Sequence, residues 1–343
     1  MKNVLFATTA LVAFAGAASA ASHGGMAPAV SFSGEMTAGY NDGDVVPANR
    51  GMFYDANLDM SVTVDMGDSV TATLTAGIAT GDERTPGGTL AFNPTIEIAY
   101  TGPVNASLRM GDMNDKGASE YFYADRSGMA LDVENQDNAT DVRTLVEFGS
   151  YGAAVGCQLA NTNSCQGLNA GAGATFGTIK IGVGYDTAGN AAGARTGVSV
   201  DASVASFDVG VSYITDNTDN SIGLELGRTF GAIKVGAYYA SNSAPASSNA
   251  YGVSADYSTG ALSLGAYYDS AATNSYGLNV GYAVSDAIQV SAGVKVDAVT
   301  DYYVGMEYTV NSNISATVSY ATADAISGPE FKNGITALIT ASF

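Results

Sequence analysis

The chain has 343 residues, a formal net charge of −20 and 13% charged residues, against roughly 25% in soluble domains. This acidic balance argues against a nucleic-acid partner, whose phosphates need a basic face. The regularly patterned hydrophobic residues, 46% of the chain, argue against intrinsic disorder. The single histidine, His23, lies close to the N-terminus, so the body of the chain cannot assemble Ser-His-Asp catalysis, Cys-His catalysis or a His-ligated zinc site. We expect no enzyme, although chemistry that uses carboxylates alone stays open.

The first twenty residues are typical of a secretory signal peptide. Lys2 provides the positive start, Val4 to Ala18 form an apolar run, and Ala18-Ser19-Ala20 is a small-x-small cleavage site. We predict cleavage after Ala20 and a mature chain, residues 21–343, that forms a single domain. No later stretch approaches the roughly 20 apolar residues of a spanning helix. Insertion of the exported chain into a membrane therefore requires strands.

From Val30 onward, apolar and polar residues alternate with a period of two, which is typical of strands with one apolar and one wet face. The runs recur about twenty times, and tight turns alternate with longer polar connections. A transmembrane barrel has this asymmetry of connections and a girdle of aromatic residues at each interface. We predict an all-β, antiparallel up-and-down barrel with an even number of strands, closed by the alternating strand Ile335 to Phe343. Aromatic residues stand at strand ends at Tyr40, Tyr100, Tyr185, Tyr213, Tyr239 and Tyr268.

Residues 111–141 interrupt the alternation. This segment is rich in acids and contains the aromatic triplet Tyr121, Phe122 and Tyr123. A segment of this length without regular structure is usually functional, and aromatic residues usually pack against something. A surface loop without a function is the alternative.

Four features together resemble the general porins of Gram-negative bacteria, and most closely the alphaproteobacterial members. They are the signal peptide, the strand Val30-Ser31-Phe32-Ser33-Gly34, the segment Met110-Gly111-Asp112 leading to Gly117-Ala118-Ser119-Glu120, and the terminal Phe343. The resemblance implies sixteen strands, a homotrimer, and a long third loop that folds into the barrel. It also implies that Phe343 belongs to the signal read by the barrel-assembly machinery. Because the pattern count is about twenty, we predict between 16 and 20 strands.

A water-filled pore filters solutes by size and charge. We predict passive diffusion of small hydrophilic solutes and ions through the outer membrane, with a mild preference for cations because acids exceed bases. Strand parity places lumen-facing acids at Glu35, Asp55, Asp59, Glu97, Glu147 and Glu225, and a lumen-facing base at Lys295. For the constriction we predict the loop acids Asp112, Asp115, Glu120 and Asp125, facing the wall bases Arg109, Arg143, Lys180 and Lys234. The alternative for each of these residues is a solvated charge that sets no selectivity.

Other readings stay open. A substrate-specific channel would need an aromatic path in the lumen, for which Tyr121 and Tyr123 are candidates, and a structural or adhesive barrel would have no open pore. Cys157 and Cys165 are close in an exported chain and form either a local disulfide or two free thiols. We expect no cofactor, although the acidic loops could hold Ca²⁺ through oxygen ligands. The expected partners are solutes and ions, outer-membrane lipid and lipopolysaccharide, the assembly machinery and further copies of the chain.

Overall fold

The computed structural model describes residues 28–43, 51–80, 90–111, 113, 118–119, 122, 126–133, 141–159, 165–187, 193–243, 249–271, 273–323 and 332–343. Twenty strands account for most of these residues, and no helix within the described ranges is both long and apolar enough to cross a membrane. The strands are β1 (Ala29–Asn41), β2 (Gly51–Gly67), β3 (Val70–Thr80), β4 (Leu90–Tyr100), β5 (Asn105–Gly111), β6 (Val142–Phe148), β7 (Tyr151–Leu159), β8 (Cys165–Phe176), β9 (Ile179–Asp186), β10 (Arg195–Val204), β11 (Phe207–Thr215), β12 (Asn220–Phe230), β13 (Ile233–Asn242), β14 (Ala250–Thr259), β15 (Leu262–Asp269), β16 (Ser275–Ser285), β17 (Ile288–Val296), β18 (Thr300–Asn311), β19 (Ile314–Ala321) and β20 (Gly334–Ser342).

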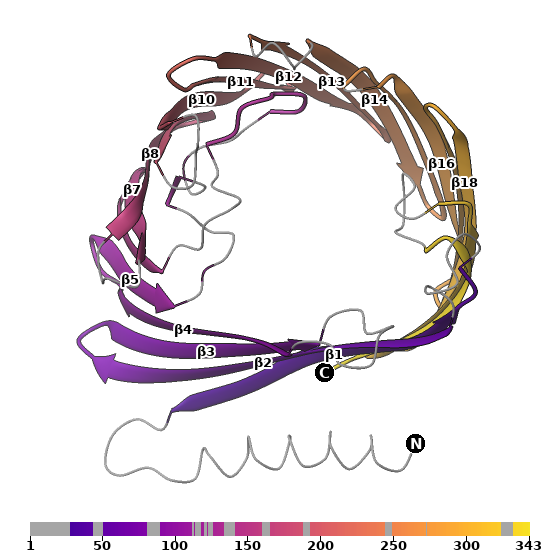
Figure 1. Cartoon of the computed structure of the whole chain (residues 1–343), viewed down its shortest axis with the longest axis horizontal. Coiled ribbons are helices and arrows are strands. Elements are labelled where there is room, and N and C mark those ends of the chain that lie inside the picture. Colours follow the sequence, from indigo (N-terminus) through magenta and orange to yellow (C-terminus); the bar gives the residue numbers. More distant parts are fainter. Residues whose placement is uncertain are drawn as a thin grey trace.

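The strands form one closed barrel (Figure 1). Each strand pairs antiparallel with its neighbours in the sequence, and β1 pairs with β20 over Glu35 to Asn41, which removes the free edges of the sheet. The twenty strands confirm the number counted from the alternation of apolar and polar residues. The sixteen strands implied by the family resemblance are wrong for this chain.

Phe343 completes the closure. Its backbone N–H donates to the Gly34 carbonyl at 3.0 Å, and the Gly34 N–H donates to the Phe343 carbonyl at 3.1 Å. A Cβ on Gly34 would lie 2.7 Å from the Phe343 ring, so glycine is needed where the terminal ring crosses β1. The terminal residue therefore packs against the first strand.

The two ends of the barrel differ, as the sequence predicts. Short turns join even-numbered strands to the following odd-numbered strands, for example at Gly177 and at Gly231, both of which have positive φ. The chain begins β1 and ends β20 at this same end. Most connections at the opposite end are longer, and the longest follows β5. In outer-membrane barrels the short turns are periplasmic and the long loops external.

The alternation places apolar side chains outside and polar side chains inside. Leu224, Leu226 and Ile339, among many others, face outward with 43%, 46% and 57% of their surface exposed, as expected for a face that meets lipid. Aromatic residues gather at both ends of this face. Tyr151 packs edge-on against Phe176 at the short-turn end, with ring centroids 5.8 Å apart. Tyr251 packs against Tyr268 near the long-loop end, also at 5.8 Å.

Candidate functional site

The described parts of the long connection after β5, among them residues 126–133, lie inside the ring of strands (Figure 1). It leaves the wall at Gly111, where φ is +121°. A Cβ at this position would collide with the Pro94 carbonyl oxygen of β4, so another residue could not make this exit. Met113, two residues later, is only 5% exposed. The family resemblance implied an inward-folding third loop, and the described parts of residues 111–141 confirm it. We call this segment the inner loop.

The first part of the inner loop lies on wall glycines. The Asn169 side chain of β8 accepts a hydrogen bond from the Ala118 N–H at 2.5 Å, and Ala118 is fully buried. A Cβ on Gly171 would lie 2.5 Å from the Ala118 carbonyl oxygen, and a Cβ on Gly182 would overlap the Phe122 carbonyl. Glycine on the inner face of β8 and β9 thus allows the backbone of the inner loop to contact the backbone of the wall.

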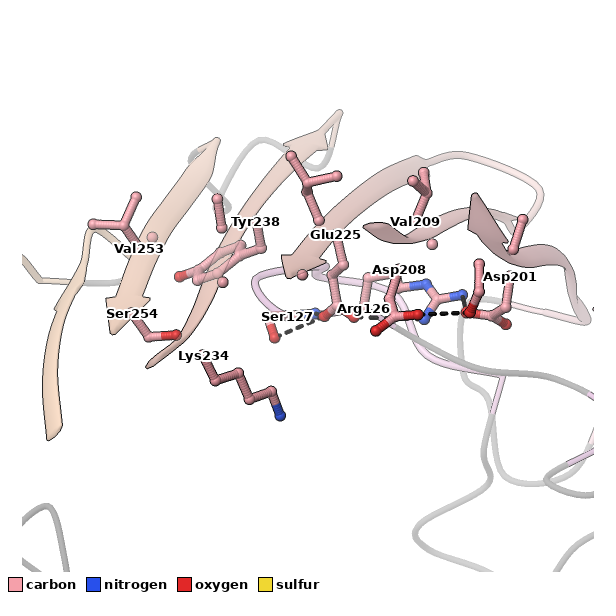
Figure 2. Close-up of a pocket in the computed structure, with 18 of the residues that line it drawn as sticks. Arg126, Ser127, Asp201, Asp208, Val209, Glu225, Lys234, Tyr238, Val253 and Ser254 are labelled. Atoms are coloured by element: carbon pink, nitrogen blue, oxygen red, sulfur yellow. Dashed lines mark hydrogen bonds and ion pairs between the residues drawn. The ribbon is translucent and has the colours of Figure 1, made fainter. Parts of the chain in front are cut away.

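Arg126 anchors the middle of the inner loop (Figure 2). Its guanidinium forms an ion pair with Asp201 of β10 at 2.5 Å and another with Glu225 of β12 at 3.5 Å, and its side chain is only 8% exposed. Its Nε donates to the Ser212 hydroxyl of β11 at 3.1 Å. Both the N–H and the hydroxyl of Ser127 donate to Glu225, at 2.9 and 3.0 Å. One base of the inner loop therefore spans three strands of the wall.

An apolar contact secures the part of the inner loop that follows. Leu131 and Val133 are 6% and 0% exposed and pack against Ile214, which is fully buried although it stands on the inner face of β11. The Leu131 N–H also donates to the Ser221 hydroxyl at 3.2 Å, and Arg195 donates to the Asp132 carbonyl at 2.9 Å. Ile214, an apolar residue at a lumen position, indicates in the sequence that another segment covers this wall. The prediction from the sequence did not use this indication.

The inner loop leaves open space beside it. A cavity of about 800 Å³ adjoins Arg126 and is lined by Lys180, Lys234 and Asp208 among others. A second cavity of about 720 Å³ lies on the side of Phe122 and Glu147. Water and small solutes can occupy both, and charges of both signs line the first. This narrowed section is the candidate functional site.

The four predicted wall bases all lie on the inner face, as their parity predicts. Arg109 of β5 pairs in register with Glu97 on one side and with Arg143 on the other. Arg109 also donates to the Thr95 hydroxyl at 3.3 Å, and Arg143 is 3% exposed. Two arginines of neighbouring strands therefore lie opposite each other in register where the inner loop begins.

Lys180 and Lys234 are exposed to the lumen on β9 and β13. Lys180 lies opposite Asp201 in register, next to the ion pairs of Arg126, and Lys234 lies opposite Asp256. Their predicted partners Asp112, Asp115, Glu120 and Asp125 lie outside the described residues, as do Tyr121 and Tyr123, so their role in the constriction stays a prediction.

In the described part of the inner loop, the ion pairs have the opposite charges to those predicted. The sequence reading paired acids of the inner loop with bases of the wall. Arg126 has the opposite arrangement, a base of the inner loop held by the wall acids Asp201 and Glu225. Glu225 was predicted to face the lumen, whereas Asp201 and Arg126 were missed as site residues, because parity assigns a face but not a partner.

Cys157 and Cys165 lie on the paired strands β7 and β8, where Leu159 is in register with Cys165. Both are free thiols in the structure. The local disulfide stays a prediction.

A closed antiparallel barrel with an apolar outer face, a polar lumen and an inward-folded loop defines a channel-forming outer-membrane protein. A family model for Gram-negative porins matches residues 7–328, and the chain belongs to this family. It is an outer-membrane porin that forms a channel for small solutes, in a family of channels without enzymatic activity.

Solved structures with similarity to the chain include engineered mutants of the porin from Rhodopseudomonas blastica. One is 14% identical, covers 92% of this chain and 100% of that chain, and has a TM-score of 0.48. Another, with the same coverage, is 16% identical with a TM-score of 0.42. No curated protein matches the chain.

Proposed function

We propose that the channel is a mildly cation-selective diffusion pore, narrowed where the inner loop lies against β8 to β13. The observation that carries this proposal is the charge of the wall. Register places the acids of the strands on the inner face, where they outnumber the bases. These acids are Glu35, Asp55, Asp59, Asp65, Glu97, Glu147, Asp186, Asp201, Asp208, Glu225, Asp256, Asp269, Asp301 and Glu307, and the bases are Arg109, Arg143, Lys180, Arg195, Lys234 and Lys295.

The preference is mild because bases lie next to the acids in the narrowed section. Arg126 neutralises part of the charge of Asp201 and Glu225, and Lys180 stands beside them. Salt reduces the remaining field over a Debye length of about 8 Å at physiological ionic strength. The selectivity should therefore weaken as the salt concentration rises.

Reversal potentials in planar bilayers test this proposal. In a KCl gradient the purified protein should give a potential of the sign that indicates K⁺ permeating faster than Cl⁻, and the potential should shrink at higher mean salt. Clear anion selectivity would overturn the proposal. Liposome swelling that saturates with one solute would indicate a substrate-specific channel instead, and a complete lack of conductance would indicate a structural barrel.

We further propose that residues 1–20 are removed on export, that residues 21–343 form one barrel domain, and that the barrel assembles as a homotrimer. N-terminal sequencing of the mature protein tests the cleavage, and the native mass in detergent tests the trimer. Among the described residues no group of three or more metal-binding side chains is placed to hold an ion. Ca²⁺ at the acidic loops stays a prediction, which Ca²⁺-dependent thermal stability would test.

Phe343 is proposed as the assembly signal in addition to its packing on Gly34. Phe343→Ala should lower the amount of folded barrel in outer-membrane fractions. Gly34→Ala, which disturbs the packing but keeps the terminal aromatic, separates the two roles. Unchanged assembly of the Phe343 variant would contradict the signal.

A further inference from the structure

Arg228 is the exception to the charge pattern of the wall. Every other charged residue within the twenty strands lies on the lumen face by register. Arg228 of β12 instead lies opposite Phe207 on β11 and Val235 on β13, which face outward. It stands two residues before Phe230, the last residue of β12, and therefore close to the short turn at Gly231. Its position puts a fixed positive charge on the lipid face, at the level of the periplasmic aromatic girdle.

Two aromatic rings hold the guanidinium in place. The Arg228 Cζ lies 4.3 Å from the centroid of the Phe207 ring and 4.4 Å from that of the Phe230 ring. These cation–π contacts orient the group but use none of its N–H donors. The Nε atom is buried without a hydrogen-bond partner, and no hydrogen bond or ion pair among the described residues involves Arg228. The terminal N–H groups of the guanidinium are therefore available to bind an anion.

A groove of about 500 Å³ begins at Arg228 and crosses the outer face of β13, β14 and β15. Its lining includes Ala237, Ala255 and Ala266, one small residue on each of the three strands, together with the larger Leu226, Val253 and Tyr268. An apolar groove of this kind fits an acyl chain, because small residues leave a depression in a face otherwise covered by large side chains.

We propose that this groove binds an anionic phospholipid of the periplasmic leaflet, with its phosphate on the guanidinium of Arg228 and an acyl chain over the three alanines. A guanidinium matches a phosphate group through paired N–H donors, and basic positions next to membrane-embedded surfaces recognise lipid head groups. The level of Arg228, beside the short turn at Gly231, favours phospholipid over lipopolysaccharide, which occupies the outer leaflet at the long-loop end. The proposal rests on the outer-membrane setting of the porin and not on its ion selectivity.

Native mass spectrometry of the whole folded protein in detergent, titrated with phosphatidylglycerol, tests the site. The wild type should retain at least one phosphatidylglycerol, and R228Q should weaken this binding by about tenfold, as expected for the loss of a charged hydrogen-bonding partner. K295Q is the control for charge, because Lys295 is a base of the lumen face that pairs with Asp297 at 3.2 Å. It should bind phosphatidylglycerol as the wild type does.

A second pair of variants tests the groove without touching the charge. A255F places a ring in the groove and should also release the lipid, whereas V304F places the same side chain on the lipid face of β18 and should not. The heat-induced mobility shift in gel electrophoresis shows that each variant is folded. R228K keeps the charge and loses the planar donors, and should bind with intermediate strength.

Three results would overturn the proposal. R228Q and A255F could retain phosphatidylglycerol like the wild type. Inorganic phosphate at millimolar concentration could displace the lipid, which would indicate a phosphate site that needs no acyl chain. The variants could change the oligomeric mass while lipid binding stays constant, which would assign the groove to contact with a second copy of the chain. The conductance and the reversal potential of R228Q should remain those of the wild type. A failure of the lipid-site proposal is therefore distinguishable from a failure of the proposed ion selectivity.

Discussion

In two parts of the barrel wall, different groups fill the recesses that glycines leave on the inner face. Both carry glycines on the inner face, which leave recesses in the lumen. On β8 and β9 the recesses at Gly171 and Gly182 are filled by the backbone of the inner loop. From β13 to β18, tyrosines of neighbouring strands fill them, and the inner loop contacts the first of these strands through Gly128 and Ala130.

The tyrosine arrangement is regular. Tyr238 covers Gly252, Tyr267 covers Gly277 and Tyr303 covers Gly293, and in each pair the two residues lie directly opposite in register. An aromatic ring over a glycine stabilises strand pairing and keeps register. Beyond β13 the tyrosines fill the recesses of the wall by themselves, whereas from β8 to β13 the wall also contacts a segment held by ion pairs and hydrogen bonds. This difference separates residues that stabilise the barrel from residues that set the size of the pore.

The largest effect on stability is expected at Tyr303, whose side chain is 3% exposed. Tyr303→Ala empties the recess over Gly293 and should lower the free energy of unfolding by about 3–5 kcal/mol, the usual cost of truncating a buried aromatic residue. Single-channel conductance should change little, because the inner loop lies elsewhere. Denaturant unfolding in lipid vesicles measures the effect. Tyr302→Ala is the control, because Tyr302 is 49% exposed on the lipid face; equal losses in both variants would contradict the covering role of Tyr303.

Gly182→Ala should detach part of the inner loop. The added Cβ overlaps the Phe122 carbonyl, and relieving such a clash costs about 1–3 kcal/mol, which the loop can avoid by moving away from the wall. Single-channel conductance should therefore rise. Gly227→Ala is the matched control, since its Cβ would lie 3.8 Å from Asp208 and meet ordinary packing. A conductance equal to that of the wild type in the Gly182 variant would show that the loop does not limit the pore there.

Arg126→Gln removes the base that holds Asp201 and Glu225. Each charged hydrogen bond contributes about 1.5–3 kcal/mol when well protected, and less here because both acids are more than a third exposed. Selectivity for cations should increase, because two acids lose their counter-charge, and this appears as a larger reversal potential. Arg126→Lys keeps the charge and should retain the selectivity of the wild type while losing the hydrogen bond to Ser212. If both variants gave the potential of the wild type, the charge of Arg126 would have no part in filtering ions.

The smallest effect is the loss of stability at low pH in the turn that contains Asp216, at the edge of the wall covered by the inner loop. In the connection between β11 and β12, backbone N–H groups of Asp219 and Thr218 donate to the Asp216 carboxylate and hold its pKa below the ordinary value of 3.8. A carboxyl with a lowered pKa stabilises the folded connection above the unfolded pKa, and this contribution is lost as the pH falls through the lower folded value. Carboxyl chemical shifts in NMR spectra should place the Asp216 titration below that of a model peptide.

Asp216→Asn should remove this pH dependence and leave the tyrosine side unaffected. A titration of Asp216 at or above 3.8 would show that the turn does not hold the carboxylate in solution.

Much of the fold could be predicted because the information is local. A strand of the barrel reveals its two faces through residues two positions apart, so parity assigned Arg109, Arg143, Lys180 and Lys234 to the lumen and produced the count of twenty. The tyrosine pairs were present in the sequence as Tyr-Tyr at 238–239, 267–268 and 302–303. In each, one ring faces the girdle and the other covers a glycine, a pattern that was available and not used.

The candidate site was less accessible for a physical reason. The partners of the inner loop are far away in sequence: Arg126 reaches Asp201 across 75 positions and Glu225 across 99. No periodicity relates such residues. The sequence therefore predicted ion pairs between the loop and the wall, but it could not decide which of the two carries the base. The observed contact in the described part of the loop has the opposite polarity.

The sequence by itself determined that the chain forms a barrel in a membrane, which face of each strand meets water and where the long loop interrupts the wall, because alternation and composition are properties of neighbouring residues. Only the tertiary structure decided what fills the glycine recesses, which charges meet at the narrowed section, and that Arg228 stands between two aromatic rings on the lipid face. These depend on strand register and on the path of the inner loop, which bring together residues that the linear pattern leaves unrelated.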